Sequence, residues 1–196
     1  HELIDSHPVP LTGDATAAKP MEGIYTALQR YDAAVLARPF ATNMVTSGVI
    51  SMVSELLRQR LLKVQEPKNV PKQILLGSCL LAPLSTAWFN ILERIFRSWD
   101  ASRGRTVLFK TCCEQAVFAP FINTCFMIFQ GLLDGRKVQE IDIDVRRNFW
   151  AVQKGNMAVW VPANLISYKY VPARLRVLFA NFVAVFWMLF LIWKTS

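Results

Sequence analysis

Two residue types that enzymes commonly use are scarce in this 196-residue chain, which has two histidines and eight glycines. Both histidines, His1 and His7, lie in the first ten residues, and the chain contains neither an HExxH zinc motif nor a glycine-rich phosphate-binding loop. After residue 7 the chain has no further histidine that could activate a serine or cysteine in the apolar segments. The sequence therefore indicates a protein without catalytic activity, cofactor or metal site.

Acidic residues are also in the minority, with 14 Asp and Glu against 22 Lys and Arg, a net charge of +8. The basic residues fall between apolar runs and form no stripe with aromatic residues, so we interpret them as contacts to lipid headgroups and not to nucleic acid. The four cysteines show no CxxC spacing and lie inside apolar segments, which favours small packing residues over a disulfide framework.

Apolar residues, in contrast, make up 53% of the chain. This share is too high for an ordinary soluble domain, and the length allows one or two domains at most. The composition therefore predicts an all-α polytopic membrane protein.

Long apolar segments predict four transmembrane helices, over residues 41–57, 74–96, 107–133 and 175–193. A helix that crosses a hydrocarbon core of about 30 Å needs roughly 20 residues at ~1.5 Å per residue. Four crossings would leave both tails on the same side as the loop 97–106. The first span is rich in small residues, and we expect this small face to pack against the hairpin of the second and third spans and not against lipid.

Several shorter segments complete the prediction. Residues 1–20 are polar and contain three prolines, which predicts an irregular N-terminal arm. Apolar residues at three- and four-residue spacing over 21–37 predict an amphipathic helix in the membrane interface. Residues 134–154 are expected to be a mixed-charge connector, and residues 156–170 a short interfacial or re-entrant helix. Residues 21–196 would thus form a single membrane domain.

The second and third predicted spans form a hairpin that brings charged residues to one depth. Folding it about its polar loop places Glu93 level with Lys110, and Arg94 near Glu114. Ionisable groups inside a bilayer cost a few kcal/mol on insertion scales, so each needs a partner or a function. We expect a charge clasp between helices, with a polar pore or relay as the alternative. The residues assigned to it are Glu55, Glu93, Arg94, Lys110, Glu114 and Gln115.

Four prolines inside the apolar segments, Pro83, Pro120, Pro162 and Pro172, predict helix breaks. Proline has no backbone N–H and leaves the carbonyl one turn earlier without its helical donor. Pro83 and Pro120 come level near mid-membrane, so the two breaks could form a hinge or a constriction, or kinks that fit neighbouring helices.

Basic residues beside aromatic ones precede the last predicted span. Lys169, Arg174 and Arg176 would suit an anionic lipid such as cardiolipin. The alternative is that these side chains only extend towards the membrane surface, as Lys and Arg near helix ends usually do.

A series of short motifs runs through the chain in a fixed order. They are Leu36–Pro39, Thr46–Gly48, Ser54-Glu55 with Gln59, Ala82-Pro83, Trp88-Phe89, Leu92-Glu93, Lys110 with Glu114-Gln115, Ala119-Pro120, Asn156, Trp160–Pro162, Ser167-Tyr168, Val171-Pro172, Arg176 and Trp187. This series resembles the family of small membrane proteins grouped as Mpv-seventeen and the twenty-two-kilodalton peroxisomal membrane protein. The resemblance implies a four-span, non-enzymatic protein of the mitochondrial inner membrane or the peroxisomal membrane, with members proposed to form solute-conducting channels.

Two functions follow from these observations. One is an accessory structural subunit of a larger respiratory-chain or ATP-synthase-type complex in the mitochondrial inner membrane, whose partners are membrane lipids and other subunits. The alternative is a channel-like protein of membrane-potential and mitochondrial homeostasis. We favour the subunit because departures from the family pattern fall at polar positions, because the chain starts without Met, and because a long arm gains order by lying on a partner.

Overall fold

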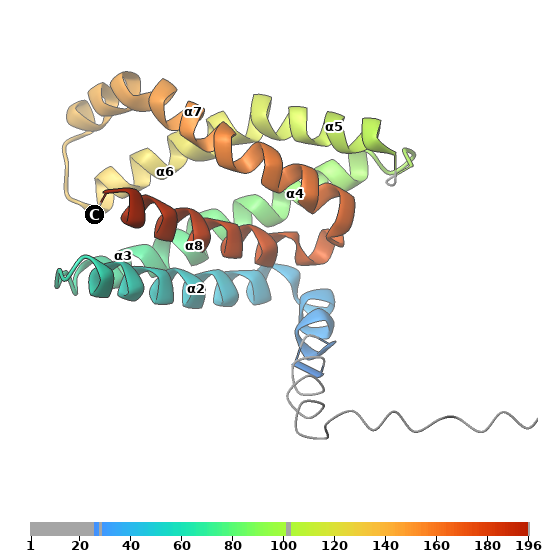
Figure 1. Ribbon diagram of the computed structural model, residues 1–196, viewed down its shortest axis with the longest axis horizontal. Coiled ribbons are helices and arrows are strands. Elements are labelled where there is room, and N and C mark those ends of the chain that lie inside the picture. Colours follow the sequence, from blue (N-terminus) through green and yellow to red (C-terminus); the bar gives the residue numbers. More distant parts are fainter. Residues whose placement is uncertain (1–25, 28, 101–102, 196) are drawn as a thin grey trace, which may run out of the picture.

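The computed structural model describes residues 26–27, 29–100 and 103–195, with side chains to residue 186. All regular structure in these residues is helical, which confirms the all-α class. The predicted arm over residues 1–20 lies outside the described residues. Of the predicted amphipathic helix, residues 26–27 and 29–37 are described and helical, and this segment lies at an angle to the rest of the molecule (Figure 1).

The first membrane-length helix, α2 (Pro39–Leu61), extends beyond the predicted span 41–57 at both ends. It begins with a proline, which fits the first helical turn because the N–H it lacks has no helical acceptor there. Its last turn contains Arg58 and Arg60, whose positive charges are favourable near the carbonyl end of a helix.

The predicted hairpin is present as two long helical segments. The first consists of α3 (Asn69–Leu75), a π-helical turn η1 (Leu76–Leu81) and α4 (Ala82–Ile95). The second consists of α5 (Gly104–Cys113), a π-helical turn η2 (Glu114–Phe118) and α6 (Ala119–Leu133). With α2, these segments are long and apolar enough to cross a membrane.

The π-helical turns replace the breaks expected at two prolines. Pro83 follows η1 by two residues, and Pro120 follows η2 by two residues. In a π-helical turn the N–H bonds to the carbonyl five residues earlier, so the hydrogen-bond pattern changes just before the residue that cannot donate. The segments therefore continue as helices through both positions.

The expected connector and short helix are wrong, because residues Val138–Tyr170 form one continuous helix, α7. The charges that suggested a connector stabilise the helix: Arg146 donates to Asp142 at 2.9 Å, and the Lys137 N–H bonds to the Glu140 carboxylate at 3.3 Å at the first turn. Pro162 lies inside α7. Pro172 lies just after α7, before a single 3₁₀ turn η3 (Ala173–Leu175).

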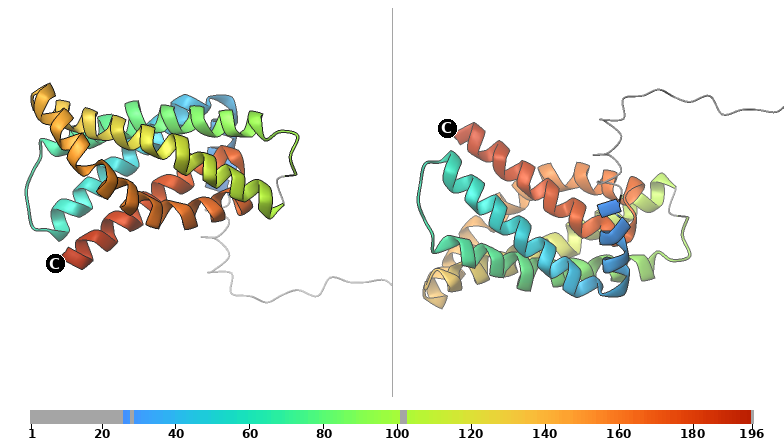
Figure 2. Two further views of the ribbon diagram at one scale, coloured as in Figure 1. Left: turned by 90° about the horizontal axis from the view of Figure 1, so that it is seen from above. Right: turned by 90° about the horizontal axis from the view of Figure 1, so that it is seen from below.

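The last helix, α8 (Arg176–Thr195), matches the predicted span 175–193 in position. Its C-terminal part lies beyond the described side chains, and the number of four membrane spans stays a prediction. The long helices lie side by side, with α7 running along α5 and α6, and α8 along α2 (Figures 1 and 2).

The expectation that both tails share one side is wrong for the described chain. The start of α2 lies near the loop between α4 and α5, whereas the end of α8 lies at the opposite end of the bundle (Figure 1). The cause is α7, which passes along the bundle once more and so adds a traverse that the sequence did not predict.

Two glycines let helices approach closely. A Cβ atom on Gly77 would lie 2.1 Å from Ser51 Oγ and 3.0 Å from the carbonyl oxygen of Ser47, so η1 packs directly on the small face of α2. This confirms the predicted packing of that face. A Cβ atom on Gly131 would lie 2.7 Å from Ile141, where α7 turns back onto α6.

Candidate functional site

Polar side chains from four helices meet inside the bundle near the α4–α5 loop. Glu93 accepts hydrogen bonds from Lys110 Nζ at 2.6 Å and from Arg176 Nη1 at 2.5 Å. Lys110 and Arg176 are buried, with 3% and 5% of their surface exposed, while the Glu93 side chain is 37% exposed. One carboxylate at the edge of the bundle therefore neutralises two buried cations.

Aromatic rings hold the two cations in place. The Arg176 guanidinium lies 5.0 Å from the centre of the Tyr168 ring, and its Nε donates to the carbonyl oxygen of Val171 at 3.2 Å. Lys110 Nζ lies 5.9 Å from the centre of the Phe96 ring. Both distances fall in the range of cation–π attraction, which adds to the ion pairs.

Glu114 lies one turn further along the same helical segment as Lys110 and is buried. Its Oε2 accepts from Tyr168 OH at 2.7 Å and from Trp88 Nε1. Trp88 in turn stacks on Phe118 with ring centres 5.1 Å apart. We call Glu93, Lys110, Glu114, Tyr168 and Arg176 the charged cluster.

A second group of polar residues, all uncharged, lies beside the earlier part of α7, before Tyr168. Asn123 donates to Gln153 at 3.0 Å, Asn156 donates to Asn123 at 3.3 Å, and Gln153 donates to the carbonyl oxygen of Gln115 at 3.5 Å. We call these four residues the amide cluster. Its hydrogen bonds are longer than those of the charged cluster and connect α6, α7 and η2.

Four buried polar atoms in this part of the bundle have no partner among the described residues. They are Nε2 and Oε1 of Gln115, Oδ1 of Asn156 and Nδ2 of Asn164. Asn164 is 4% exposed and lies on α7 between the two clusters, one turn before Tyr168. An unpaired polar atom in a membrane interior costs free energy, so these atoms are available to hydrogen-bond water or another polar molecule.

A third set of bonds connects α2 to its neighbours. Asn43 donates to Thr86 at 3.0 Å, and Asn181 donates to Ser47 at 2.7 Å. Both contacts lie between uncharged groups from different helices. They join α2 to α4 and α8 and fix how these helices are rotated against one another.

Of the two ion pairs predicted for Glu93 and Glu114, the structure contains one. The Glu93–Lys110 pair is confirmed. The pairing of Arg94 with Glu114 is wrong: Arg94 is exposed on the surface, and Glu114 points into the bundle towards Tyr168. Residues at one depth of a helix can point to different faces, because each residue turns the helix by about 100°.

Glu55 forms the local contacts that its spacing suggests. Arg58 donates to it through Nε at 2.8 Å and Nη2 at 2.7 Å, and Gln59 donates at 2.8 Å. This group lies at the end of α2, away from the charged cluster. Gln115, which was also predicted as a site residue, belongs to the amide cluster through its backbone carbonyl.

The residues suggested for an anionic lipid are engaged elsewhere. Arg176 is buried on Glu93, and Arg174 pairs with Asp32 of the N-terminal helical segment. Lys169 Nζ lies 5.1 Å from the centre of the Tyr170 ring. Arg176 is therefore not free to meet a lipid headgroup, because its charge is used inside the protein.

Several site residues were not predicted. Trp88, a donor to Glu114, lies on the hairpin itself. The other contacts depend on α7 and α8 packing onto the hairpin: Tyr168 with Glu114, Arg176 with Glu93, and the positions of Gln153 and Asn164. A signal was present in the polar residues Gln153, Asn156, Asn164 and Tyr168, which recur at three, four and eight residues along one face of a helix.

Within the described ranges, no group of three or more His, Cys, Asp or Glu side chains is placed to hold a metal ion. The polar interior consists of ion pairs and amide hydrogen bonds. This arrangement can join helices or hydrogen-bond a small polar molecule.

Comparison with known proteins identifies the group to which the chain belongs. The sequence profile of the Mpv17 / PMP22 family matches residues 131–191, which include all of α7 and most of α8. PXMP2/4 family protein 3 of Dictyostelium discoideum is 30% identical over 79% of this chain and 83% of its own length. No solved structure matches the chain.

The names of two further relatives state the membrane to which each belongs. Mitochondrial inner membrane protein Mpv17 of Caenorhabditis briggsae is 29% identical over 86% of this chain and 93% of its own length. Peroxisomal membrane protein 2 of Bos taurus is 27% identical over 84% and 87%, respectively. These names support the predicted location, the mitochondrial inner membrane with the peroxisomal membrane as the alternative. The apolar helices, the polar motif residues inside them and these relatives agree that the chain is a member of the Mpv17 / PMP22 family.

Proposed function

We propose that this chain is a non-catalytic accessory subunit of a larger respiratory-chain or ATP-synthase-type complex in the mitochondrial inner membrane. The observation that carries the proposal is the pairing inside the charged cluster. Glu93 and Glu114 each accept two hydrogen bonds from other helices, and the buried Lys110 and Arg176 share one carboxylate. A pore that attracts ions by charge needs charged groups facing its lumen, whereas these groups face one another.

The ends of the bundle support a role in an assembly. The helical segment 29–37 projects from the bundle, with Leu36 64% exposed, and is held to η3 through Asp32 and Arg174 (Figure 1). The predicted polar arm, residues 1–20, precedes it in the sequence. Such an arm offers a partner subunit an extended surface outside the membrane.

Sizing of the native protein tests this proposal. Mitochondrial membranes are solubilised in mild detergent, and the chain is located after native electrophoresis. Comigration with a respiratory-chain or ATP-synthase-type complex is the expected result. Migration as a free monomer or small oligomer contradicts the proposal. A variant without residues 1–25 should lose comigration while its helix content by circular dichroism stays the same.

The amide cluster favours a second candidate, a channel-like protein that conducts a small solute. The unpaired amide atoms belong to Gln115 on η2 and to Asn156 and Asn164 on α7, and they could hydrogen-bond an uncharged or weakly charged solute. Planar-bilayer recording of the purified chain tests this alternative. Conductance that Asn164→Leu abolishes, without loss of thermal stability, would favour the channel over the subunit.

A further inference from the structure

The outer face of α2 is apolar and exposed over most of its length. Val45, Val49, Val53 and Leu56 are 68%, 51%, 45% and 49% exposed. At 100° per residue these positions lie within about 80° of one another on the helix. Since α2 is long and apolar enough to cross a membrane, this face is turned towards acyl chains.

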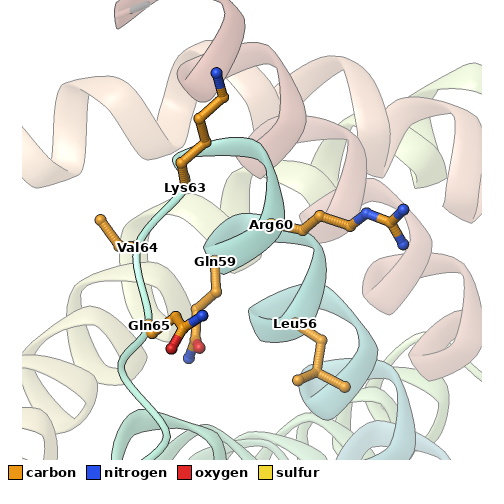
Figure 3. Close-up of a pocket in the computed structure, with 6 residues that line it drawn as sticks. All are labelled: Leu56, Gln59, Arg60, Lys63, Val64 and Gln65. Carbon is orange, nitrogen blue, oxygen red and sulfur yellow. The ribbon is translucent and has the colours of Figure 1, made fainter.

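The face ends at a polar hollow. Arg60 continues the same face, and Lys63 follows in the loop with a φ of 54°, a left-handed conformation that is uncommon outside glycine. A surface pocket of about 410 Å³ lies here, lined by Leu56, Gln59, Arg60, Lys63, Val64 and Gln65 (Figure 3). Figure 3 shows Lys63 and Arg60 extending outwards from the end of α2 in different directions, with the amides of Gln59 and Gln65 together on the loop side.

Arg58 and Lys72 lie nearby but, unlike the two cations of the hollow, are paired with carboxylates. Arg58 pairs with Glu55 and Glu66, both at 2.7 Å, and Lys72 pairs with Asp134 at 2.6 Å. In the part of the chain that the structure describes, no carboxylate lies within ion-pair distance of Arg60 or Lys63. Their positive charges are therefore available to an anion from outside the chain.

We propose that this hollow holds the phosphate group of an anionic phospholipid, whose acyl chains lie along the outer face of α2. Two cations and an exposed amide suit a phosphate oxygen cluster, and an apolar face that runs from the hollow into the membrane suits the chains of the same molecule. A free phosphate would use only the first of these features. The site is at the opposite end of the bundle from Lys169, Arg174 and Arg176 and does not depend on the proposed subunit role.

Native mass spectrometry of the full chain tests the site. The protein is purified from nanodiscs of phosphatidylcholine with phosphatidylglycerol or cardiolipin, and the retained anionic lipid is counted. The test variant is Arg60→Gln with Lys63→Gln. The control is Arg94→Gln with Arg97→Gln, which removes the same charge from exposed residues at the other end of the bundle. Retention of the anionic lipid should fall about 30-fold in the test variant, because two basic residues that attract an anionic group are removed. It should change little in the control.

Several outcomes would overturn the proposal. Equal losses in both variants indicate general attraction of anionic lipid to a basic protein. Unchanged retention, or binding of inorganic phosphate in place of lipid, also contradicts it, as does a dimer of this chain that dissociates in the test variant. If the test variant does not fold, Arg60→Lys with Lys63→Arg keeps both charges and should retain the lipid, and loss of the lipid from this folded variant would contradict the proposal.

Discussion

The charged cluster and the amide cluster both include residues of α7, yet their polar atoms are hydrogen-bonded to different degrees. In the charged cluster, Glu93 and Glu114 each accept hydrogen bonds from two donors. The bonds from Lys110, Tyr168 and Arg176 measure 2.5–2.7 Å. In the amide cluster the bonds measure 3.0–3.5 Å, and three of the four unpaired atoms belong to it. The difference indicates that the charges hold helices together, while the amides leave hydrogen-bonding capacity unused.

Removal of Glu93 should have the largest effect on stability. Glu93→Leu leaves Lys110 and Arg176 buried without a counter-charge, and we expect a loss of about 3–5 kcal/mol in the free energy of unfolding. Chemical unfolding in detergent, followed by circular dichroism, measures it. Glu66→Gln is the control, because Glu66 is an exposed partner of Arg58 and should cost less than about 1 kcal/mol. Equal losses in both variants would contradict the structural role of the charged cluster.

Replacement of Glu114 by Leu should have the next largest effect. Tyr168 and Trp88 would lose their acceptor, and the unmet bonds should cost about 1–3 kcal/mol. Glu114→Gln keeps one acceptor and should lose less. Thermal unfolding compares the three proteins, and bilayer recording is done in parallel. Unchanged stability of Glu114→Leu with lost conductance would assign Glu114 to a pore instead.

A change in the amide cluster should cost less. Gln153→Leu removes the acceptor of Asn123, and since interhelical hydrogen bonds in membranes are weak on average, we expect a loss of about 0.5–1 kcal/mol. The double variant Asn123→Leu with Gln153→Leu measures the coupling between the two side chains. A loss as large as that of Glu114→Leu would remove the distinction between the clusters.

The smallest effect should come from a pair outside the apolar interior. The hydrogen bond from Lys72 lowers the pKa of Asp134 below its usual value. Because the pKa is lower in the folded state, the pair stabilises the fold fully above the usual pKa of an unfolded aspartate, and this stability is lost as the pH falls through the folded pKa. The difference in unfolding free energy between the wild type and Asp134→Asn should stay below about 0.5 kcal/mol near neutral pH and vanish in acid. A difference that persists in acid would contradict this cause.

The sequence predicted one ion pair within the hairpin and missed the contacts that the later helices make with it. The pair Glu93–Lys110 follows from folding two adjacent segments about their loop. Arg176 joins Glu93 across 83 positions, and no local periodicity points to that contact. The orientation of Glu114 was missed because depth alone was matched, and η2 begins at this residue and changes the phase of the helix.

The length of α7 was missed for a different reason. Charged residues between 134 and 154 suggested an aqueous connector, but charges four positions apart also stabilise a helix, as Arg146 and Asp142 do here. Sequence pattern alone does not distinguish these two cases. Once α7 is known to be continuous, its polar residues fall on the face that meets the hairpin.

The π-helical turns affect how this chain is compared with its relatives. A π-helical turn holds about one residue more than an α-helical turn, so a relative with an uninterrupted α-helix would align with a one-residue gap at residues 76–81 or 114–118. A gap placed elsewhere would shift the positions in between by one residue, or about 100° around the helix. Interior positions such as Asn123 would then be compared with residues that face lipid, and the placement of these gaps decides which polar residues are judged to be shared across the family.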